Sequence, residues 1–285
     1  MHTVSRRNFL QQSVAVGAAV GALASTQASA RTYGTNDELR LGVIGTGGRG
    51  QWLLANWVRP IVDKHKVRVA AVCDIWNRNR DAGAKLVSDQ FGYAPKVLTD
   101  YRAVLDAKDI DAVIIATPDH QHCGMLVAAV QAGKDVYIEK PIAMNMAELN
   151  RAYDVVTASS QIVQHGTQGR SCPGADSARA FVQADGLGKL LRVEESRSFY
   201  YPYWNYQPTV ERESDTDWKA FLFGLPDRPF DGEACGGWMG YRPFSTGPVG
   251  GWMSHFSDLI HYVTGCDFPI AGVCQGGVYS PTSKP

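Results

Sequence analysis

A glycine-rich turn near the start of the chain has the residue types and the spacing that hold a pyrophosphate group. Residues 45–50 read Gly-Thr-Gly-Gly-Arg-Gly, so Gly45, Gly47 and Gly50 form a G-x-G-x-x-G pattern. The first glycine permits a tight turn, the second lets the backbone approach a phosphate, and the third lets the following helix pack against the strand. The candidate cofactor-binding residues of this turn are therefore Gly45, Thr46, Gly47, Gly48, Arg49 and Gly50.

An acidic residue follows at the distance at which such a turn is paired with a ribose-binding carboxylate. Asp74 ends the apolar stretch 67–73 and lies 24 residues after Gly50. A carboxylate there accepts hydrogen bonds from both ribose hydroxyls and repels a 2′-phosphate, which favours NAD as the cofactor. Arg78 and Arg80 are close enough in sequence to weaken that preference, so NADP stays open. A strand–turn–helix unit without a ligand is the alternative.

The elements that must position these residues alternate between strands and helices. We expect apolar strands at residues 40–45, 67–73, 96–98, 112–116, 135–138 and 161–164. We expect helices at residues 49–58, 81–91, 101–107, 120–132 and 144–159. This alternation predicts an α/β fold with a doubly wound parallel sheet of the Rossmann type, whose ligands bind beyond the carboxyl ends of the strands.

The composition is that of a folded globular protein. The chain has 285 residues, of which 45% are hydrophobic, and 28 Lys and Arg residues balance 28 Asp and Glu residues. Without a basic surplus to neutralise phosphates, nucleic acid is not expected as a partner. After residue 30 no stretch approaches the roughly 18 consecutive apolar residues of a membrane span, so none is expected in the mature protein.

The first thirty residues have the features of an export signal. Twin arginines, Arg6 and Arg7, precede an apolar run at 14–23 and the small residues Ala28-Ser29-Ala30. This pattern predicts a Tat signal peptide over residues 1–30 that is cleaved after Ala30, and a periplasmic or otherwise exported protein. A membrane anchor is the alternative, but the apolar run is about half as long as the roughly 20 residues a span needs.

Together these motifs resemble the Gfo/Idh/MocA oxidoreductases, the relatives of glucose–fructose oxidoreductase and inositol dehydrogenase. The resemblance runs over about residues 39–278, and Glu139-Lys140-Pro141 is its most specific sign. It implies a Rossmann domain over 36–165, followed over 166–285 by an α+β substrate and oligomerisation domain with an open, mostly antiparallel sheet. A homo-oligomer through that sheet is expected. Because members are usually longer, we expect a domain shortened at its C-terminus.

The resemblance also assigns roles to residues near the reacting groups. It implies further cofactor-binding residues, Thr117, Pro118, His120, His122, Glu139 and Lys140. It places Lys140 beside the nicotinamide, where an ammonium group can stabilise negative charge developing on an alcohol oxygen. A surface lysine is the alternative for Lys140, and helix capping or packing is the alternative for the two histidines.

His255 is the second candidate catalytic residue. The family commonly carries Asp-x-Gly-x-His-x-x-Asp, and residues 251–258 read Gly-Trp-Met-Ser-His-Phe-Ser-Asp. His255 and Asp258 match this pattern, whereas Gly251 replaces the first carboxylate. A histidine can still act as a base at neutral pH, and a packing role is the alternative. His255, Asp258 and His261 diverge around a helix of 3.6 residues per turn, so no metal site is expected.

Three residues are candidates for substrate binding, namely Arg170, Tyr200 and Asp258. Tyr200 belongs to an aromatic cluster at 200–206 that could stack on a sugar or form a subunit interface. Arg170 could hold a substrate carboxylate or phosphate, or be a plain surface charge.

The sequence predicts an exported oxidoreductase that transfers a hydride between a tightly bound NAD(P) and a hydroxyl of a sugar or polyol. An NAD-assisted glycoside hydrolase and a non-catalytic sugar- or NAD-binding protein are the alternatives. Scarcity of free NAD outside the cytoplasm is the reason to expect that the cofactor is bound before export.

Overall fold

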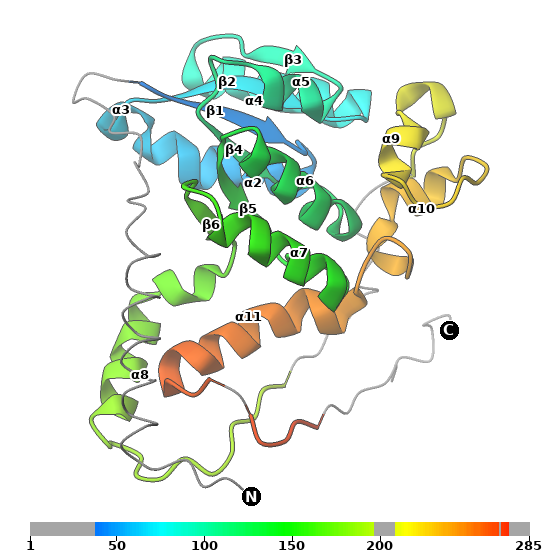
Figure 1. Ribbon diagram of the computed structural model, residues 1–285. Coiled ribbons are helices and arrows are strands. Elements are labelled where there is room, and N and C mark those ends of the chain that lie inside the picture. Colours follow the sequence, from blue (N-terminus) through cyan, green and yellow to red (C-terminus); the bar gives the residue numbers. More distant parts are fainter. Residues whose placement is uncertain (1–37, 197–208, 268, 274–285) are drawn as a thin grey trace, which may run out of the picture.

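A six-stranded parallel sheet forms the core of the computed structural model, which describes residues 38–196, 209–267 and 269–273 (Figure 1). The strands are β1 (Leu39–Ile44), β2 (Val67–Cys73), β3 (Lys96–Leu98), β4 (Ala112–Ile115), β5 (Asp135–Ile138) and β6 (Val163–His165). Their order in the sheet is β3-β2-β1-β4-β5-β6, and every neighbouring pair is parallel. This is the doubly wound Rossmann order, which confirms the predicted fold class for the first half.

Helices cover both faces of the sheet. They are α2 (Gly48–Leu53), α3 (Val62–His65), α4 (Asn77–Phe91), α5 (Tyr101–Asp106), α6 (Asp119–Gln131) and α7 (Met146–Thr157). A π-helix at Leu54–Val58 and a 3-10 turn at Arg59–Ile61 join α2 to α3. One buried cluster packs α5, α6 and α7 on one face, and another packs α2 and α4 on the other. Burial on both faces explains why the strands read as continuous apolar runs.

Side-chain caps fix where several helices begin. The Asp100 carboxylate accepts the backbone N–H of Arg102 at the start of α5, and the Asn145 side chain accepts that of Glu148 at the start of α7. Such caps satisfy amide groups that have no partner within the helix. Helix α4 begins at Asn77, four residues earlier than predicted, because the backbone N–H of Trp76 donates to Asp74 and anchors the preceding turn.

The second half contributes helices around the carboxyl edge of the sheet. They are η3 (Gln168–Ser171), α8 (Pro173–Gln183), η4 (Glu213–Asp215), α9 (Trp218–Leu222), α10 (Gly232–Gly236), η5 (Trp238–Gly240) and α11 (Gly247–Thr264). Helix α11 packs against α8 (Figure 1). It begins at Gly247 and carries Pro248 in its first turn, where a missing N–H costs nothing.

The described residues contain no second sheet. No strand forms at residues 190–196, and residues 197–208 lie outside the described ranges. Residues 1–30 and Tyr200 also lie outside them. Strand β6 ends at His165. The boundary between two domains after residue 165 stays a prediction. None of the helices that the structure describes is long and apolar enough to cross a membrane.

Candidate functional site

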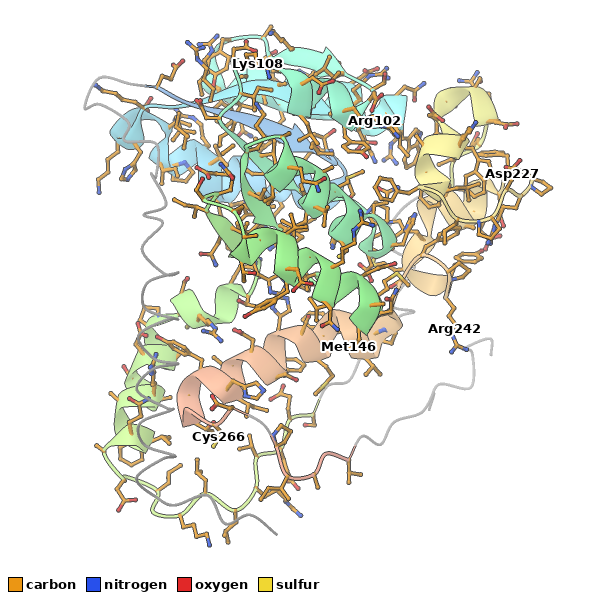
Figure 2. All side chains as sticks on the ribbon, in the orientation of Figure 1. Arg102, Lys108, Met146, Asp227, Arg242 and Cys266 are labelled. Carbon is orange, nitrogen blue, oxygen red and sulfur yellow. The ribbon has the colours of Figure 1, made fainter. Side chains whose placement is uncertain are left out.

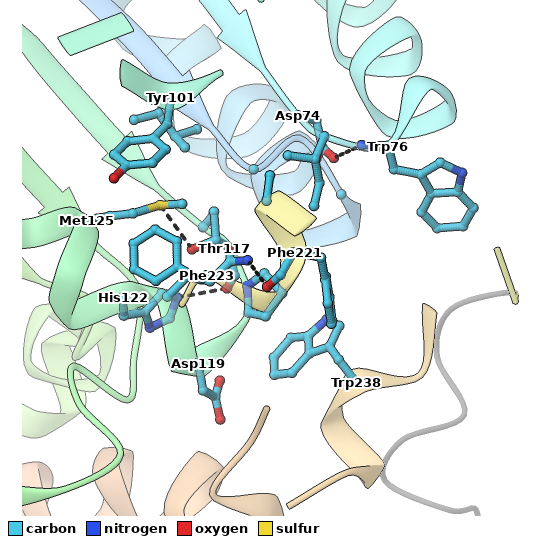
Figure 3. Close-up of a pocket in the computed structure, with 18 of the residues that line it drawn as sticks. Asp74, Trp76, Tyr101, Thr117, Asp119, His122, Met125, Phe221, Phe223 and Trp238 are labelled. Atoms are coloured by element: carbon cyan, nitrogen blue, oxygen red, sulfur yellow. Dashed lines mark hydrogen bonds between the residues drawn. The ribbon is translucent and has the colours of Figure 1, made fainter. Parts of the chain in front are cut away.

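A cavity of about 1460 Å³ lies over the carboxyl ends of the central strands (Figure 3). It is larger than the usual 300–1,000 Å³ of a small-molecule pocket. Most of the predicted cofactor-binding residues line it, namely Gly45, Gly47, Gly48, Arg49, Asp74, Thr117, Pro118, His122, Glu139 and Lys140. The topology brings these residues together because each follows a parallel strand at the same edge of the sheet.

Glycine occupies each of the three positions of the turn for a different steric reason. Gly45 has a φ of +87°, and a Cβ there would lie 2.6 Å from the Ala116 carbonyl oxygen. A Cβ at Gly50 would lie 2.0 Å from the Gly45 carbonyl oxygen. A Cβ at Gly47, in contrast, would meet the Asn79 side chain only at 3.4 Å. Gly47 therefore leaves open space on the cavity side, where a bound group can approach the backbone.

The start of α2 presents backbone amides to this open space. The first hydrogen bond of the turn runs from the Gln51 N–H to the Gly47 carbonyl. The amides of residues 48–50 precede it and lack partners within the helix, which is the arrangement that binds anionic groups. Thr46 does not join them: it is fully buried, its N–H donates to Asp74 and its hydroxyl donates to the Asn79 carbonyl. Thr46 therefore supports the turn, and its contact with a cofactor stays a prediction.

Asp74 is oriented by the backbone before any ligand arrives. One carboxylate oxygen accepts the Thr46 N–H at 2.8 Å, and the other accepts the Trp76 N–H at 2.9 Å. Burial raises the pKa of Asp74 to about 6, although these two amides and the charge of Arg80 oppose the rise. Arg80 pairs with Asp81, and neither Arg78 nor Arg80 lines the cavity. The carboxylate rather than an arginine thus faces the ribose position.

The raised pKa of Asp74 makes a prediction for nucleotide binding. Ribose hydroxyls donate hydrogen bonds to the ionised carboxylate, so binding should release a proton wherever Asp74 is protonated in the free protein. The affinity for NAD should rise with pH up to about 6, by at most about tenfold per pH unit, and then level off. Calorimetric titration with NAD between pH 5 and pH 8 measures this dependence.

The Asp74→Asn variant is the control, because its side chain does not ionise, and its affinity should change less over the same range. The free energy of unfolding of the free protein should change with pH in the opposite direction to the NAD affinity. A carboxyl whose folded pKa lies above its unfolded value stabilises the protein at low pH, and that contribution is lost as the pH rises toward 6. An NAD affinity that falls as the pH rises from 5 to 6 would contradict this assignment.

Glu139 ties the glycine turn to the end of β5. It is buried, and one carboxylate oxygen lies 2.7 Å from the Arg49 Nε and 2.6 Å from an Nη of the same guanidinium. The Tyr137 hydroxyl and the Gln168 amide donate to the same oxygen. The Arg49 guanidinium also lies 4.6 Å from the centre of the Trp52 ring. Arg49 is therefore held between the phosphate-binding turn and the segment that carries Lys140.

Lys140 is half-buried at the cavity wall. Within the described residues its ammonium group has no hydrogen bond or ion pair with the protein. Burial lowers its pKa, and the charges of Glu139 and Asp119 partly offset this effect. An ammonium group without an internal partner can donate to a ligand oxygen. Asp119, which the sequence analysis missed, is buried and accepts hydrogen bonds from Ser245 and Thr246.

His255 reaches the same cavity from helix α11, together with Trp252. Burial and the charge of Lys140 lower the pKa of His255 below its ordinary value, so the neutral ring predominates at neutral pH. No described residue hydrogen-bonds to either ring nitrogen. Gly251, which stands where the family pattern has a carboxylate, is buried in the same helix. His255 thus lies on a helix and lines the cavity, and no described carboxylate hydrogen-bonds to its ring.

The two histidines of the β4–α6 segment have different surroundings. Both ring nitrogens of His122 contact carbonyl oxygens, those of Pro141 at 2.7 Å and Thr117 at 2.8 Å, so this residue clamps two segments of the site. His120 does not line the cavity. Its Nε2 lies within hydrogen-bond distance of the Phe221 carbonyl and its ring packs on Phe221, which is the packing alternative, whereas its contact with a cofactor stays a prediction.

Arg170 and Asp258, both predicted to bind substrate, lie next to each other, and their substrate-binding role stays a prediction. The Arg170 Nε lies 2.7 and 2.8 Å from the two carboxylate oxygens of Asp258, and neither residue lines the cavity. The two charges thus form an ion pair with each other outside the cavity. Among the described residues no group of three or more metal-ligating side chains occurs.

The residues around the cavity fit a dinucleotide. The space beside Gly47, the amides of residues 48–50 and the oriented Asp74 carboxylate match a pyrophosphate and a ribose in series. The fold and the site therefore define a dinucleotide-binding Rossmann domain. Residues 39–167 match the family of oxidoreductases with an NAD-binding Rossmann fold named GFO_IDH_MocA. Over these residues the chain matches the NAD-binding domain of the Gfo/Idh/MocA oxidoreductases, and a cofactor of the NAD type fits the site.

Curated relatives match the same part of the chain. Levoglucosan dehydrogenase of Pseudarthrobacter phenanthrenivorans is 28% identical over 178 residues, which are 60% of this chain and 43% of the relative. A glycosyl hydrolase family 109 protein of Shewanella sp. (strain ANA-3) is 33% identical over 169 residues, 52% of this chain and 36% of the relative. The matched regions thus span less than half the length of these relatives.

A solved structure shares the fold over a longer part of the chain. The protein, from Sinorhizobium meliloti 1021 and assigned as a myo-inositol dehydrogenase, has a TM-score of 0.55 and 21% identity. The likeness covers 80% of this chain and 56% of that one. At 21% identity this likeness supports the assignment of the fold alone.

Proposed function

We propose that this protein is an exported NAD(P)-dependent oxidoreductase that acts on a hydroxyl group of a sugar or polyol. The observation that carries the proposal is the meeting of Lys140 and His255 in the cavity that also holds the glycine turn and Asp74. The family match supports oxidoreductase chemistry. The predicted Tat signal supports export, and a homo-oligomer formed through the second domain belongs to the same proposal.

Lys140 and His255 have separate roles at the substrate hydroxyl. When bound, the nicotinamide ring takes up or returns the hydride of the alcohol carbon. Lys140 donates a hydrogen bond to the alcohol oxygen and stabilises the negative charge that develops on it. His255, neutral because burial lowers its pKa, accepts the hydroxyl proton. The ring then carries a positive charge near Lys140, so it should pass the proton on to water rather than keep it.

Turnover assays test this proposal. The purified protein is incubated with NAD or NADP and a panel of sugars, cyclitols and anhydrosugars, and formation of reduced cofactor is followed by absorbance. We expect turnover with at least one polyol and loss of that turnover in Lys140→Met. Nucleotide binding without turnover of any compound, by protein of verified fold, would favour the non-catalytic binding protein and overturn the proposal.

A redox-assisted glycoside hydrolase is the second candidate, and the relatives of glycosyl hydrolase family 109 favour it. In such a reaction the hydride removed from the sugar activates elimination of the glycosidic group and is then returned. A nitrophenyl glycoside would release nitrophenol without net reduced cofactor, whereas the oxidoreductase would accumulate reduced cofactor without cleaving the glycoside.

A further inference from the structure

An aromatic segment outside the family match, residues 210–245, lies across the cavity. Thr216 forms an isolated antiparallel bridge with Trp76, and the Asp217 N–H donates to the Ile75 carbonyl at 3.2 Å. The Gln121 side chain donates to the Phe221 carbonyl at 2.9 Å. The segment is thus fastened both to the end of β2 and to the start of α6, and α9 passes between these two points (Figure 3).

The site described above determines where the adenine of a dinucleotide would lie. The pyrophosphate belongs at the glycine turn, the adenosine ribose at Asp74 and the nicotinamide near Lys140. The adenine must then lie beyond Asp74, away from Lys140. On that side of β2 lies β3, which is followed by Tyr101 of the cavity wall, and the Phe223 ring lies beside Tyr101. Figure 3 shows the side chains of Tyr101, Phe223 and Met125 gathered together.

Phe223 is held in this wall at a cost in backbone energy. It ends α9 with a φ of +50° and a ψ of 42°, a left-handed conformation that is uncommon for a residue other than glycine. Such conformations persist where the surroundings enforce them, and they cluster at ligand sites. The enforcement comes from the buried neighbours Trp218, Phe221 and Leu222, which pack in one cluster.

The ring of Phe223 packs closely against Gly124 of helix α6. A Cβ at Gly124 would lie 2.5 Å from the Phe223 Cε1 atom, so a larger residue at position 124 would displace the ring from its present place. The ring centre lies 5.8 Å from that of Tyr101. Phe223 is nevertheless only partly buried, so part of its ring stays open to the cavity.

We propose that Phe223 is an adenine-contacting residue of the dinucleotide site, and that the aromatic segment secures the adenosine half of the cofactor. This proposal rests on the proposed function for the presence of a nicotinamide dinucleotide. An aromatic ring offers the base a stacking surface, and Phe223 adds such a surface from outside the matched region to those of Tyr101 and Trp76 within it. It also gives the exported protein a means of retaining its cofactor.

Two variants of the full-length protein test the proposal. Phe223→Gly removes the ring and relieves the left-handed backbone, and Phe223→Leu keeps an apolar side chain but no ring. Phe230→Leu is the matched control, because Phe230 is a partly buried phenylalanine of the same segment that does not line the cavity. Thermal melting verifies the fold of each variant. The probes for calorimetry are NAD, ADP-ribose and nicotinamide mononucleotide.

We expect Phe223→Gly to weaken NAD and ADP-ribose about tenfold or more and to leave nicotinamide mononucleotide unchanged. Phe223→Leu should give a smaller loss of the same pattern, and Phe230→Leu none. ADP-ribose affinity equal to that of the wild type in both Phe223 variants, or equal loss for all three probes, would overturn the role of Phe223 while the proposed function stands. Absence of NAD and ADP-ribose binding by the wild type would overturn both.

Discussion

Replacing Lys140 with methionine should lower kcat by about 100- to 1,000-fold with little change in NAD affinity. Methionine keeps the length and apolar stem of the side chain but has no donor for the alcohol oxygen. The ammonium group has no internal partner among the described residues, so its removal leaves no protein group unpaired and the fold should be retained. Steady-state kinetics with the substrate found in the panel, together with calorimetry of NAD binding, measures both effects.

Lys108→Met is the matched control for this experiment. Lys108 is an exposed lysine between α5 and β4 (Figure 2), and it does not line the cavity. Its replacement should leave kcat and NAD affinity unchanged. A Lys140→Met enzyme that keeps more than about a tenth of the wild-type kcat would show that the ammonium group does not stabilise the transition state, and the assignment of Lys140 would be wrong.

Replacing Gly50 with alanine should destabilise the protein by about 3 kcal/mol, whereas the same change at Gly47 should spare the fold and weaken NAD binding at least about tenfold. The Gly50 Cβ would lie 2.0 Å from a backbone oxygen, and backbone cannot move aside as a flexible side chain does. Gly47 has φ −66° and ψ −169°, which alanine adopts without strain, but its Cβ would occupy the space that a pyrophosphate needs.

Thermal or denaturant unfolding measures the first effect, and calorimetry measures the second. The two variants serve as controls for each other because the substitutions are identical and lie three residues apart. If Gly47→Ala bound NAD as tightly as the wild type, the glycine turn would not be the pyrophosphate site. If Gly50→Ala were as stable as the wild type, the close packing of the turn against the start of α2 would be wrong.

The Rossmann half could be predicted because its signals are local. Parallel strands buried on both faces give short, continuous apolar runs, and 112–115 is such a run that forms β4. The G-x-G-x-x-G turn, Asp74 and Glu139-Lys140 each follow a strand, so their meeting at one edge follows from topology alone.

The rest depends on contacts between residues far apart in sequence. The ion pair of Arg170 with Asp258 spans 88 positions, and no spacing rule shows that their charges are used on each other. His120 was predicted as a site residue from its place after Thr117-Pro118. Its ring instead contacts the Phe221 carbonyl, 101 positions away in the sequence. Phe223 had no local signal, because an aromatic residue before a glycine is common in turns.

Calorimetric titration of NAD into protein freed of nucleotide tests the central claim most directly. The account predicts saturable binding of one NAD per chain, with an affinity that rises with pH up to about 6 and falls in Gly47→Ala. Folded protein that gives no binding heat with NAD or NADP at two temperatures, and that carries no nucleotide in an acid extract, would contradict the account.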